Sequence, residues 1–349
     1  TVILSSFTTK LAIYALARSY AGTDILIWIG ALMAAFPIFY AVIENDLRRV
    51  LAYSLNNQLG FMVVGVGIGT EMALNGTVSH AFCHILYKSL LFMSMGAVLL
   101  RTGTANGSDL GGLFKTMPWT TAFCIVGAAS ISGFPLFSGF ISKSMILTSV
   151  SDGGYWGVWL VLLFASAGVF HHSGIKIPYF AFFAHDQGLR PKEAPASMLF
   201  AMGIIASLCF LIGIYPDILY SLLPYPVDYV PYTTAHVINQ LQLLMFSALA
   251  FAVLMVFKIY PPELRSTNID FDWIYRRGLH SLIISLGKSV NYTENLLFSA
   301  ASKSLRAMMA FIHLRFASFN KNAQTSTVGN ALVWVLALLL SLLVLAYSM

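Results

Sequence analysis

One apolar segment of the chain reads, from residue 78 to residue 92, Val78-Ser79-His80-Ala81-Phe82-Cys83-His84-Ile85-Leu86-Tyr87-Lys88-Ser89-Leu90-Leu91-Phe92. His80, His84 and Lys88 stand four residues apart, so in an α-helix they share one face and span about 12 Å. An ionisable group at membrane depth costs at least about 2.5–3.5 kcal/mol on insertion scales, which makes it a functional-site hypothesis. The spacing predicts a column of groups that relays protons across a bilayer.

The composition supports a membrane protein. Of the 349 residues, 58% are hydrophobic and only 10% are charged, whereas about 25% are charged in a typical soluble domain. The net charge is +6, but the basic residues lie mostly in loops and in the last third of the chain. That distribution is typical of the positive-inside bias of membrane proteins. We therefore expect the lipid bilayer, and no nucleic acid, as a partner.

Apolar runs of about 17–25 residues are long enough to span a bilayer. The predicted fold is all-α, a polytopic transmembrane helical bundle, with spans at 2–17, 25–43, 50–69, 77–100, 118–151, 155–172, 196–222, 236–258 and 330–348.

The 118–151 run is interrupted at Gly133-Phe134-Pro135. Proline removes a backbone donor and clashes with the preceding turn, and glycine loosens the helix further. Irregular backbone at membrane depth survives only where it is buried in protein or lines a wet cavity, and transporters place binding sites at such broken helices. Lys143 follows the break, which favours a functional interpretation; a plain proline kink is the alternative.

No pattern in the chain indicates chemistry of an enzyme. It has no Walker loop, no dinucleotide-binding glycine motif opening a helix and no cysteine cluster for iron–sulfur centres. Cys83, Cys124 and Cys209 fall in apolar segments without metal spacing. His80 and His84 have the i, i+4 spacing of some zinc sites, but no neighbouring carboxylate completes one. We expect neither a cofactor nor a metal, and whether the chain belongs to an enzyme complex stays open.

Four passages together resemble the antiporter-like membrane subunits of respiratory complex I, of membrane-bound hydrogenases and of Mrp-type cation/proton antiporters. The closest likeness is to the D-type subunit of Na+/H+ antiporters. The passages are Thr8-Thr9-Lys10-Leu11-Ala12-Ile13-Tyr14, then Asp46-Leu47-Arg48-Arg49-Val50-Leu51-Ala52-Tyr53-Ser54 with Gln58-Leu59-Gly60, then the His80–Lys88 column, and finally Gly133-Phe134-Pro135 with Gly139-Phe140-x2-Lys143.

The resemblance implies a transporter built from inverted repeats, each with a broken helix that carries an ionisable group. It implies a proton relay through Lys10, His80, His84, Lys88 and Lys143. Lys10 taken alone is equally compatible with a lysine that snorkels to the interface. Because the chain starts at Thr1 within an apolar helix, we expect an N-terminally truncated fragment, whose missing part would carry the family's partner glutamate.

Asp46, Arg48 and Arg49 are expected to steer charge. Where many relatives have lysine, this chain has Arg48, and arginine stays protonated in proteins, so this position should not relay a proton. Where relatives often have Ser-Thr-Ile-Ser, this chain has Ser54-Leu55-Asn56-Asn57, and the two asparagines either hold water or cap a helix contact. A second group of polar residues is expected outside the relay: His171 and His172 at the interface, Lys176 and His185-Asp186 in a loop.

The predicted organisation has four parts: 1–17, the end of the first-repeat broken helix; 18–258, the transmembrane core with the second repeat and further helices; 259–329, an amphipathic lateral or interfacial segment; and 330–349, a C-terminal transmembrane helix. A soluble helical linker is the alternative for the third part. Its apolar residues alternate with Lys288, Lys303, Arg306 and Arg315 at roughly helical spacing, which makes it too polar to cross a bilayer.

The predicted function is proton conduction within a multisubunit monovalent cation (Na+)/H+ antiporter in the inner membrane of a prokaryote, with other membrane subunits as partners. Buried lysine suits this work, because burial lowers the pKa of a lysine from about 10 toward the physiological range and an approaching carboxylate raises it again. One alternative is a proton-pumping subunit of an NADH:quinone oxidoreductase or of a membrane-bound hydrogenase. Another is a membrane scaffold that transports nothing. Passage of Na+ through this chain is left open.

Overall fold

The computed structural model describes residues 2–264, 273–317 and 328–348, which form helices joined by loops, with no strand among them. The predicted all-α membrane fold is confirmed. Helices long and apolar enough to cross a membrane cover Ile25–Ile43, Glu71–Thr102, Trp156–Phe183, Ala196–Ile214, Thr234–Val256 and Val328–Tyr347. The chain divides into two compact units, Thr1–Asn268 and Ile269–Met349.

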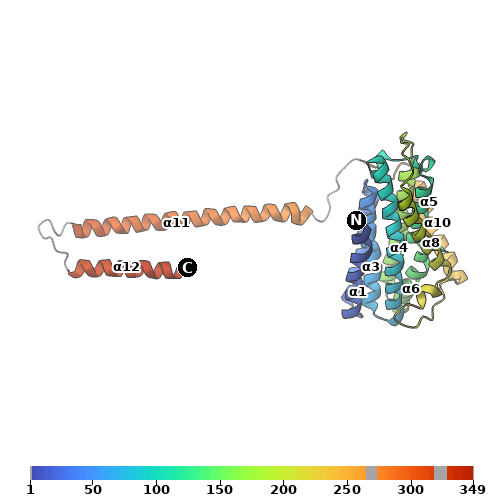
Figure 1. Cartoon of the computed structure of the whole chain (residues 1–349). Coiled ribbons are helices and arrows are strands. Elements are labelled where there is room, and N and C mark those ends of the chain that lie inside the picture. Colours follow the sequence, from blue (N-terminus) through green and yellow to red (C-terminus); the bar gives the residue numbers. More distant parts are fainter. Residues whose placement is uncertain (1, 265–272, 318–327, 349) are drawn as a thin grey trace. The chain divides into compact units, whose positions relative to one another are not determined.

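The first unit is a helical bundle (Figure 1). Its elements, in chain order, are η1 (Leu4–Thr8), α1 (Thr9–Ser19), α2 (Ile25–Ile43), α3 (Leu47–Ile68), α4 (Glu71–Thr102), the short turns η2 (Gly107–Asp109) and η3 (Leu113–Lys115), α5 (Pro118–Ser132), α6 (Ser138–Asp152), α7 (Trp156–Val169), η4 (Phe170–Lys176), η5 (Tyr179–Phe183), α8 (Ala196–Ile214), α9 (Asp217–Tyr220) and α10 (Thr234–Val256).

The second unit contains η6 (Ile274–Leu279), α11 (His280–Ala317) and α12 (Val328–Ser348). The large apolar side chains described on α11 and α12 are exposed within the unit. The predicted segment 259–329 is therefore helical over most of its length, while its residues 265–272 and 318–327 lie outside the described part of the chain.

Helix α4 is the centre of the bundle, because it packs against α3, α5, α6 and α8. The Thr70 side chain accepts a hydrogen bond from the Ala73 amide (3.3 Å) and so caps the first turn, while Gly103, at φ 79°, ends the helix. This use of a hydroxyl at the start and a left-handed glycine at the end satisfies backbone groups that a bilayer would leave unpaired. The titratable column of α4 is thus held on a long and well-terminated helix.

Helices α2 and α3 meet through small residues. A Cβ atom on Gly60 would lie 2.6 Å from the Gly30 carbonyl oxygen and 2.8 Å from the Ala34 Cα atom. Membrane helices associate closely through such positions, since lipid offers no hydrophobic drive for helix pairing. Gly60 therefore sets the distance between α2 and α3.

We expect Gly60→Ala to destabilise the bundle by about 1–3 kcal/mol, because the atoms it meets are backbone and cannot turn aside. The measurement is the thermal midpoint of the purified complex in detergent. Gly96→Ala on α4 is the matched control, since nothing lies within 4 Å of the position that its methyl group would take. Equal midpoints for the two variants would contradict close packing of α2 on α3.

The interrupted span consists of α5 and α6, which lie one after the other along α4. A Cβ on Gly127 of α5 would contact Leu91, whereas Ser142 of α6 contacts His80 (3.0 Å). Farther along, a Cβ on Gly76 would meet Ile146. Both segments therefore run in the direction opposite to α4, with the break at the level of the relay column.

The loops of the first unit gather at two opposite ends of the bundle. At the Asp46 end, residues 44–46, 103–117, 184–195 and 257–264 lie together; the Leu47 amide donates to the Ala105 carbonyl (2.9 Å) and the Gln187 amide group to the Ser108 carbonyl (3.2 Å). At the Asp24 end, the Gly22 amide donates to Val66 (2.9 Å) and the Tyr225 amide to Asn75 (3.1 Å). The two ends also differ in charge, because most of the basic residues of these loops lie at the Asp46 end.

Candidate proton-relay site

The structure buries all five titratable groups predicted to relay protons. His80, His84 and Lys88 are fully buried, and Lys10 and Lys143 are 7% and 3% exposed. Charged or polar groups are costly to bury unless they are paired or solvated, so each needs an account of its partners.

His80 is held by side chains from two other helices. Its Nε2 lies 3.2 Å from the Gln58 Oε1 of α3, and its Nδ1 lies 3.0 Å from the Ser142 Oγ of α6. The Tyr87 hydroxyl donates to the same Gln58 oxygen at 3.3 Å. Gln58 in turn donates to Asn57 (2.6 Å), whose amide bonds the Ala34 carbonyl. Because both ring nitrogens have polar neighbours, either can carry the proton.

His84 and Lys88 differ from His80, because neither has a hydrogen-bond partner among the described residues. Tyr87 packs edge-on against the His84 ring, with the centroids 5.2 Å apart, and the Lys88 ammonium lies 5.8 Å from the Phe92 ring centroid. Buried donors without protein partners are normally satisfied by ordered water. These two are therefore the members of the column that no described polar group holds in place.

Lys143 donates a hydrogen bond to a backbone carbonyl that has lost its helical donor at the break. Its Nζ donates to the Ile131 carbonyl at 3.0 Å and lies 5.4 Å from the Phe61 ring centroid. In a continuous helix this carbonyl would accept from the amide of residue 135, but Pro135 has no N–H. The chain therefore places a lysine head group at the position where the helix lacks a donor.

Lys10 is tied to the start of its own helix. Its Nζ donates to the Ser5 carbonyl (3.0 Å) and to the Thr9 hydroxyl (3.1 Å). The π-helical turn η1 contacts α4 through a hydrogen bond from the Ser89 hydroxyl to the Ser6 hydroxyl (2.9 Å). The segment that carries Lys10 is thus held against α4 next to Lys88 in sequence.

The predicted charge-steering residues have local structural partners. Asp46 caps α3, since its Oδ1 accepts from the Arg48 amide (2.8 Å) and from the Arg49 amide (3.3 Å). The Arg49 Nε lies 3.5 Å from the Glu44 carboxylate. The Arg48 Nε is buried without a hydrogen-bond partner among the described residues. These contacts explain Asp46 as a helix cap, and of the two arginines Arg48 is half-buried whereas Arg49 is exposed.

The predicted positions of His172 at the interface and of Lys176 in a loop were wrong. Lys176 lies within the span Trp156–Phe183 and not in a loop, and it is fully buried, as is His172. The Lys176 ammonium donates to the carbonyls of Val42 (2.7 Å) and Glu44 (2.7 Å) and pairs with Glu263 at 2.9 Å. The apolar run from Tyr179 to Phe183 was the signal that the helix continues past Lys176.

His185 and Asp186 lie in the loop after this span, as expected. Asp186 pairs with Arg190 (2.6 Å) and Lys115 (2.7 Å), and these two cations hold the pKa of its carboxyl well below its usual range. No group of three or more His, Cys, Asp or Glu side chains within the described ranges could hold a metal ion.

The first half of the chain matches a known protein family. Residues 1–170 match the family described as NADH:quinone oxidoreductase/Mrp antiporter, TM. The chain is 34% identical over 185 residues to the D subunit of the Na(+)/H(+) antiporter of Alkalihalophilus pseudofirmus, covering 48% of this chain and 37% of that protein. It is 28% identical over 246 residues to hydrogenase-4 component B of Escherichia coli, covering 61% of this chain and 37% of that protein. The chain thus spans well under half the length of these curated relatives.

Two solved structures share the fold. A chain of the Mrp complex from a Dietzia species superposes with a TM-score of 0.58 at 23% identity, covering 91% of this chain and 33% of that one. A chain of the membrane-bound sulfane sulfur reductase, an archaeal respiratory membrane complex, superposes with a TM-score of 0.61 at 22% identity, covering 99% of this chain and 62% of that one.

Proposed function

We propose, from the membership of residues 1–170 in the NADH:quinone oxidoreductase/Mrp antiporter transmembrane family, that this chain conducts protons in a multisubunit monovalent cation/proton antiporter. The observation that carries the proposal is the burial of Lys10, His80, His84, Lys88 and Lys143 in one bundle. Intramembrane ionisable residues normally mark ion pathways or proton relays, because their burial is otherwise unfavourable. The complex would lie in the inner membrane of a prokaryote beside other membrane subunits.

The relay would combine fixed and adaptable positions. His80 would take up a proton on one ring nitrogen and release one from the other. Its Nδ1 faces Ser142 at 3.0 Å and its Nε2 faces Gln58 at 3.2 Å. His84 and Lys88 have no side-chain partners in the described structure, so water would carry the proton between them. Lys143 connects the column to the helix break. The residue types fit this role, because histidine titrates near neutral pH and a buried lysine releases its proton readily.

A redox-driven pump is the second candidate, and the similarity to hydrogenase-4 component B supports it. The two functions differ in what drives the protons. The test uses the purified complex in vesicles with a pH-sensitive dye inside. Proton movement on an imposed Na+ gradient, without an electron donor, supports the antiporter. Proton movement only on adding an electron donor and acceptor supports the redox pump, and no movement under either condition contradicts both.

We also propose that the Asp46 end faces the cytoplasm. Its short loops carry Arg48, Arg49, Arg101, Lys115, Arg190, Lys192 and Lys258, whereas the Asp24 end carries Arg18 with Asp24, Glu71, Asp152 and Asp228. An excess of lysine and arginine in short loops orients membrane proteins with those loops inside.

Single cysteines would test this orientation. We expect Gln187→Cys at the Asp46 end to be protected from a membrane-impermeant maleimide in intact cells, and Asp152→Cys at the Asp24 end to be labelled. Both positions are exposed, and the natural Cys83, Cys124 and Cys209 are buried. Permeabilised cells are the control in which both variants should label. The reverse pattern in intact cells would overturn the orientation.

A further inference from the structure

The break between α5 and α6 separates two backbone groups that a helix would pair. In a continuous α-helix the amide of residue 136 would donate to the carbonyl of residue 132, four positions earlier. In the structure, the Ser132 carbonyl instead accepts from the Gln240 side-chain amide (3.2 Å), and the Leu136 amide donates to the Tyr232 hydroxyl (3.2 Å). Two side chains that are distant in sequence therefore replace the two halves of one missing helical bond.

Both side chains come from one region of the chain. Gln240 lies on α10, and Tyr232 lies two residues before that helix begins. The Gln240 amide group is so close to the end of α5 that a Cβ on Gly133 would lie 3.2 Å from its nitrogen. The Tyr232 hydroxyl, which accepts from Leu136, also donates to the Gly213 carbonyl of α8. The α10 region thus contacts the break on both sides and joins it to α8.

Aromatic stacking ties the same region to the start of α6. The centroid of the Phe140 ring lies 5.1 Å from that of Tyr232 and 4.4 Å from that of His236, with interplanar angles of 29° and 17°. The His236 Nδ1 lies 2.7 Å from the Pro231 carbonyl oxygen, which fixes the orientation of the imidazole ring. Phe140 stands on α6 between the break and Lys143. A displacement of the α10 region would therefore displace the helix that carries Lys143.

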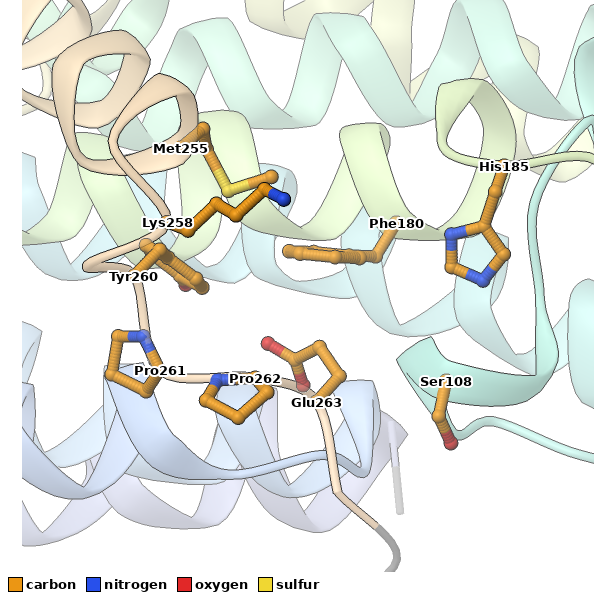
Figure 2. A pocket seen from close by; sticks show the side chains of 9 residues that line it. All are labelled: Ser108, Phe180, His185, Met255, Lys258, Tyr260, Pro261, Pro262 and Glu263. Atoms are coloured by element: carbon orange, nitrogen blue, oxygen red, sulfur yellow. The ribbon is translucent and has the colours of Figure 1, made fainter.

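Each end of the first unit carries a pocket, and Gln240 lines the one at the Asp24 end. The pocket at the Asp46 end has a volume of about 410 Å³ and contains Glu263 (Figure 2). The pocket at the Asp24 end has a volume of about 390 Å³ and is lined by Asn239, Gln240 and polar side chains of α6. The charge of a titratable residue placed at position 240 can therefore follow the pH of the solution.

We infer that Gln240 and Tyr232 are positioning residues of the relay, which keep the two ends of the break apart by pairing with their backbone groups. This inference rests on the proposed proton conduction. The acceptor of Lys143 is the Ile131 carbonyl, 3.0 Å from its Nζ, and this carbonyl directly precedes the one that Gln240 holds. Loss of either side-chain bond would leave a backbone group unpaired at membrane depth, which is unfavourable, so the ends of the break would move to regain a partner.

The first test uses the difference between a carboxylic acid, which donates a hydrogen bond, and a carboxylate, which only accepts. In Gln240→Glu, the protonated side chain can donate to the Ser132 carbonyl, whereas the ionised side chain repels it. Proton flux is measured in vesicles with the complete complex and divided by the flux of the unaltered complex at the same pH. This relative flux should fall as the pH is raised from about 4 to about 8, since carboxyl groups of proteins titrate in this range. Gln240→Leu cannot donate at any pH and should lower flux throughout by about 10-fold to 100-fold, because a misplacement of about 1 Å can cost the larger factor.

Asn239→Asp is the matched control for a carboxyl in the same pocket. The Asn239 side chain lines the pocket but makes no hydrogen bond with the described residues, so the relative flux of this variant should not change with pH. The same pH dependence in both variants would show that charge in the pocket is sufficient, and it would overturn the inference. A relative flux of Gln240→Glu that stays constant, or normal flux in Gln240→Leu, would overturn it as well. Unchanged flux in Lys88→Ala would instead contradict the proposed relay itself.

Tyr232→Phe tests the other half of the missing helical bond. The change removes the hydroxyl, with both of its backbone partners, and keeps the ring that stacks on Phe140. Proton flux should fall about as far as in Gln240→Leu, while the subunit content of the complex stays the same. Tyr229→Phe is the matched control, because Tyr229 lines the same pocket and its hydroxyl makes no hydrogen bond with the described residues. Equal flux in the two tyrosine variants would contradict a positioning role for Tyr232.

Discussion

Replacing Lys88 with arginine should lower proton flux about as far as replacing it with alanine, by about 100-fold or more, the scale of a lost proton-transfer group. Lys88 is fully buried and its ammonium has no hydrogen-bond partner among the described residues. Arginine keeps the positive charge but does not release its proton in proteins. A position that only needs a charge would tolerate arginine, whereas a position that is loaded and unloaded would not.

The measurement is dye-reported proton flux in vesicles that contain the purified complex. Lys115→Arg is the matched control, because Lys115 pairs with Asp186 at the surface of the Asp46 end and arginine can keep that pair. Subunit content and the thermal midpoint of each variant would show that the complex is assembled. Near-normal flux in Lys88→Arg would rule out proton loading at this position, even if Lys88→Ala were inactive.

The shared helix face of His80, His84 and Lys88 was predictable because its geometry is local. Three residues four apart on a helix share a face whatever the rest of the fold does, and all three are buried. Their partners were not predictable in the same way. Gln58 and Ser142 contact His80 across 22 and 62 residues of sequence. Gln58 stood inside a quoted motif, but nothing in a single sequence says which histidine it faces.

Lys176 shows how a local pattern can mislead. The run Phe170-His171-His172-Ser173-Gly174-Ile175-Lys176 contains polar residues and a glycine, which are typical of a helix end. The helix continues instead as π-helical turns to Phe183. The polar groups are accommodated by partners that are distant in sequence: the Glu44 carbonyl, 132 residues away, and the Glu263 carboxylate. Burial of a charge depends on such tertiary partners, and periodicity does not reveal them.

The helix break also has a different geometry from a simple kink. Removing Gly133 and Pro135 would favour a continuous helix on propensity alone. In the structure, however, Gly133 has φ 74° and Leu136 has φ 75°, and α6 starts beside the end of α5. A Cβ on Gly139 would run into the carbonyl group of Ser130, 2.9 Å from its carbon atom. The position that controls the break is therefore the crossing of the two segments, at Gly139.

Gly139→Ala is accordingly expected to weaken both stability and transport. The methyl group would meet backbone, so α6 has to move away from α5 at a cost of about 1–3 kcal/mol or more. That movement separates Lys143 from the Ile131 carbonyl, now 3.0 Å away, and Ser142 from His80, also 3.0 Å away. Misplacement of transfer partners by about 1 Å can lower a rate by about 100-fold. The thermal midpoint and the proton flux of the variant complex should therefore fall together.

Pro135→Ala is the informative comparison for this crossing. It restores an N–H in the break but leaves Gly139 and the left-handed Gly133 unchanged, so α5 and α6 should stay offset. We expect its flux to remain close to that of the unaltered complex. Full transport in Gly139→Ala, with a midpoint equal to that of Pro135→Ala, would mean that α6 can shift without disturbing the relay. In that case the contacts of Lys143 and Ser142 at the break would not be needed for the passage of protons.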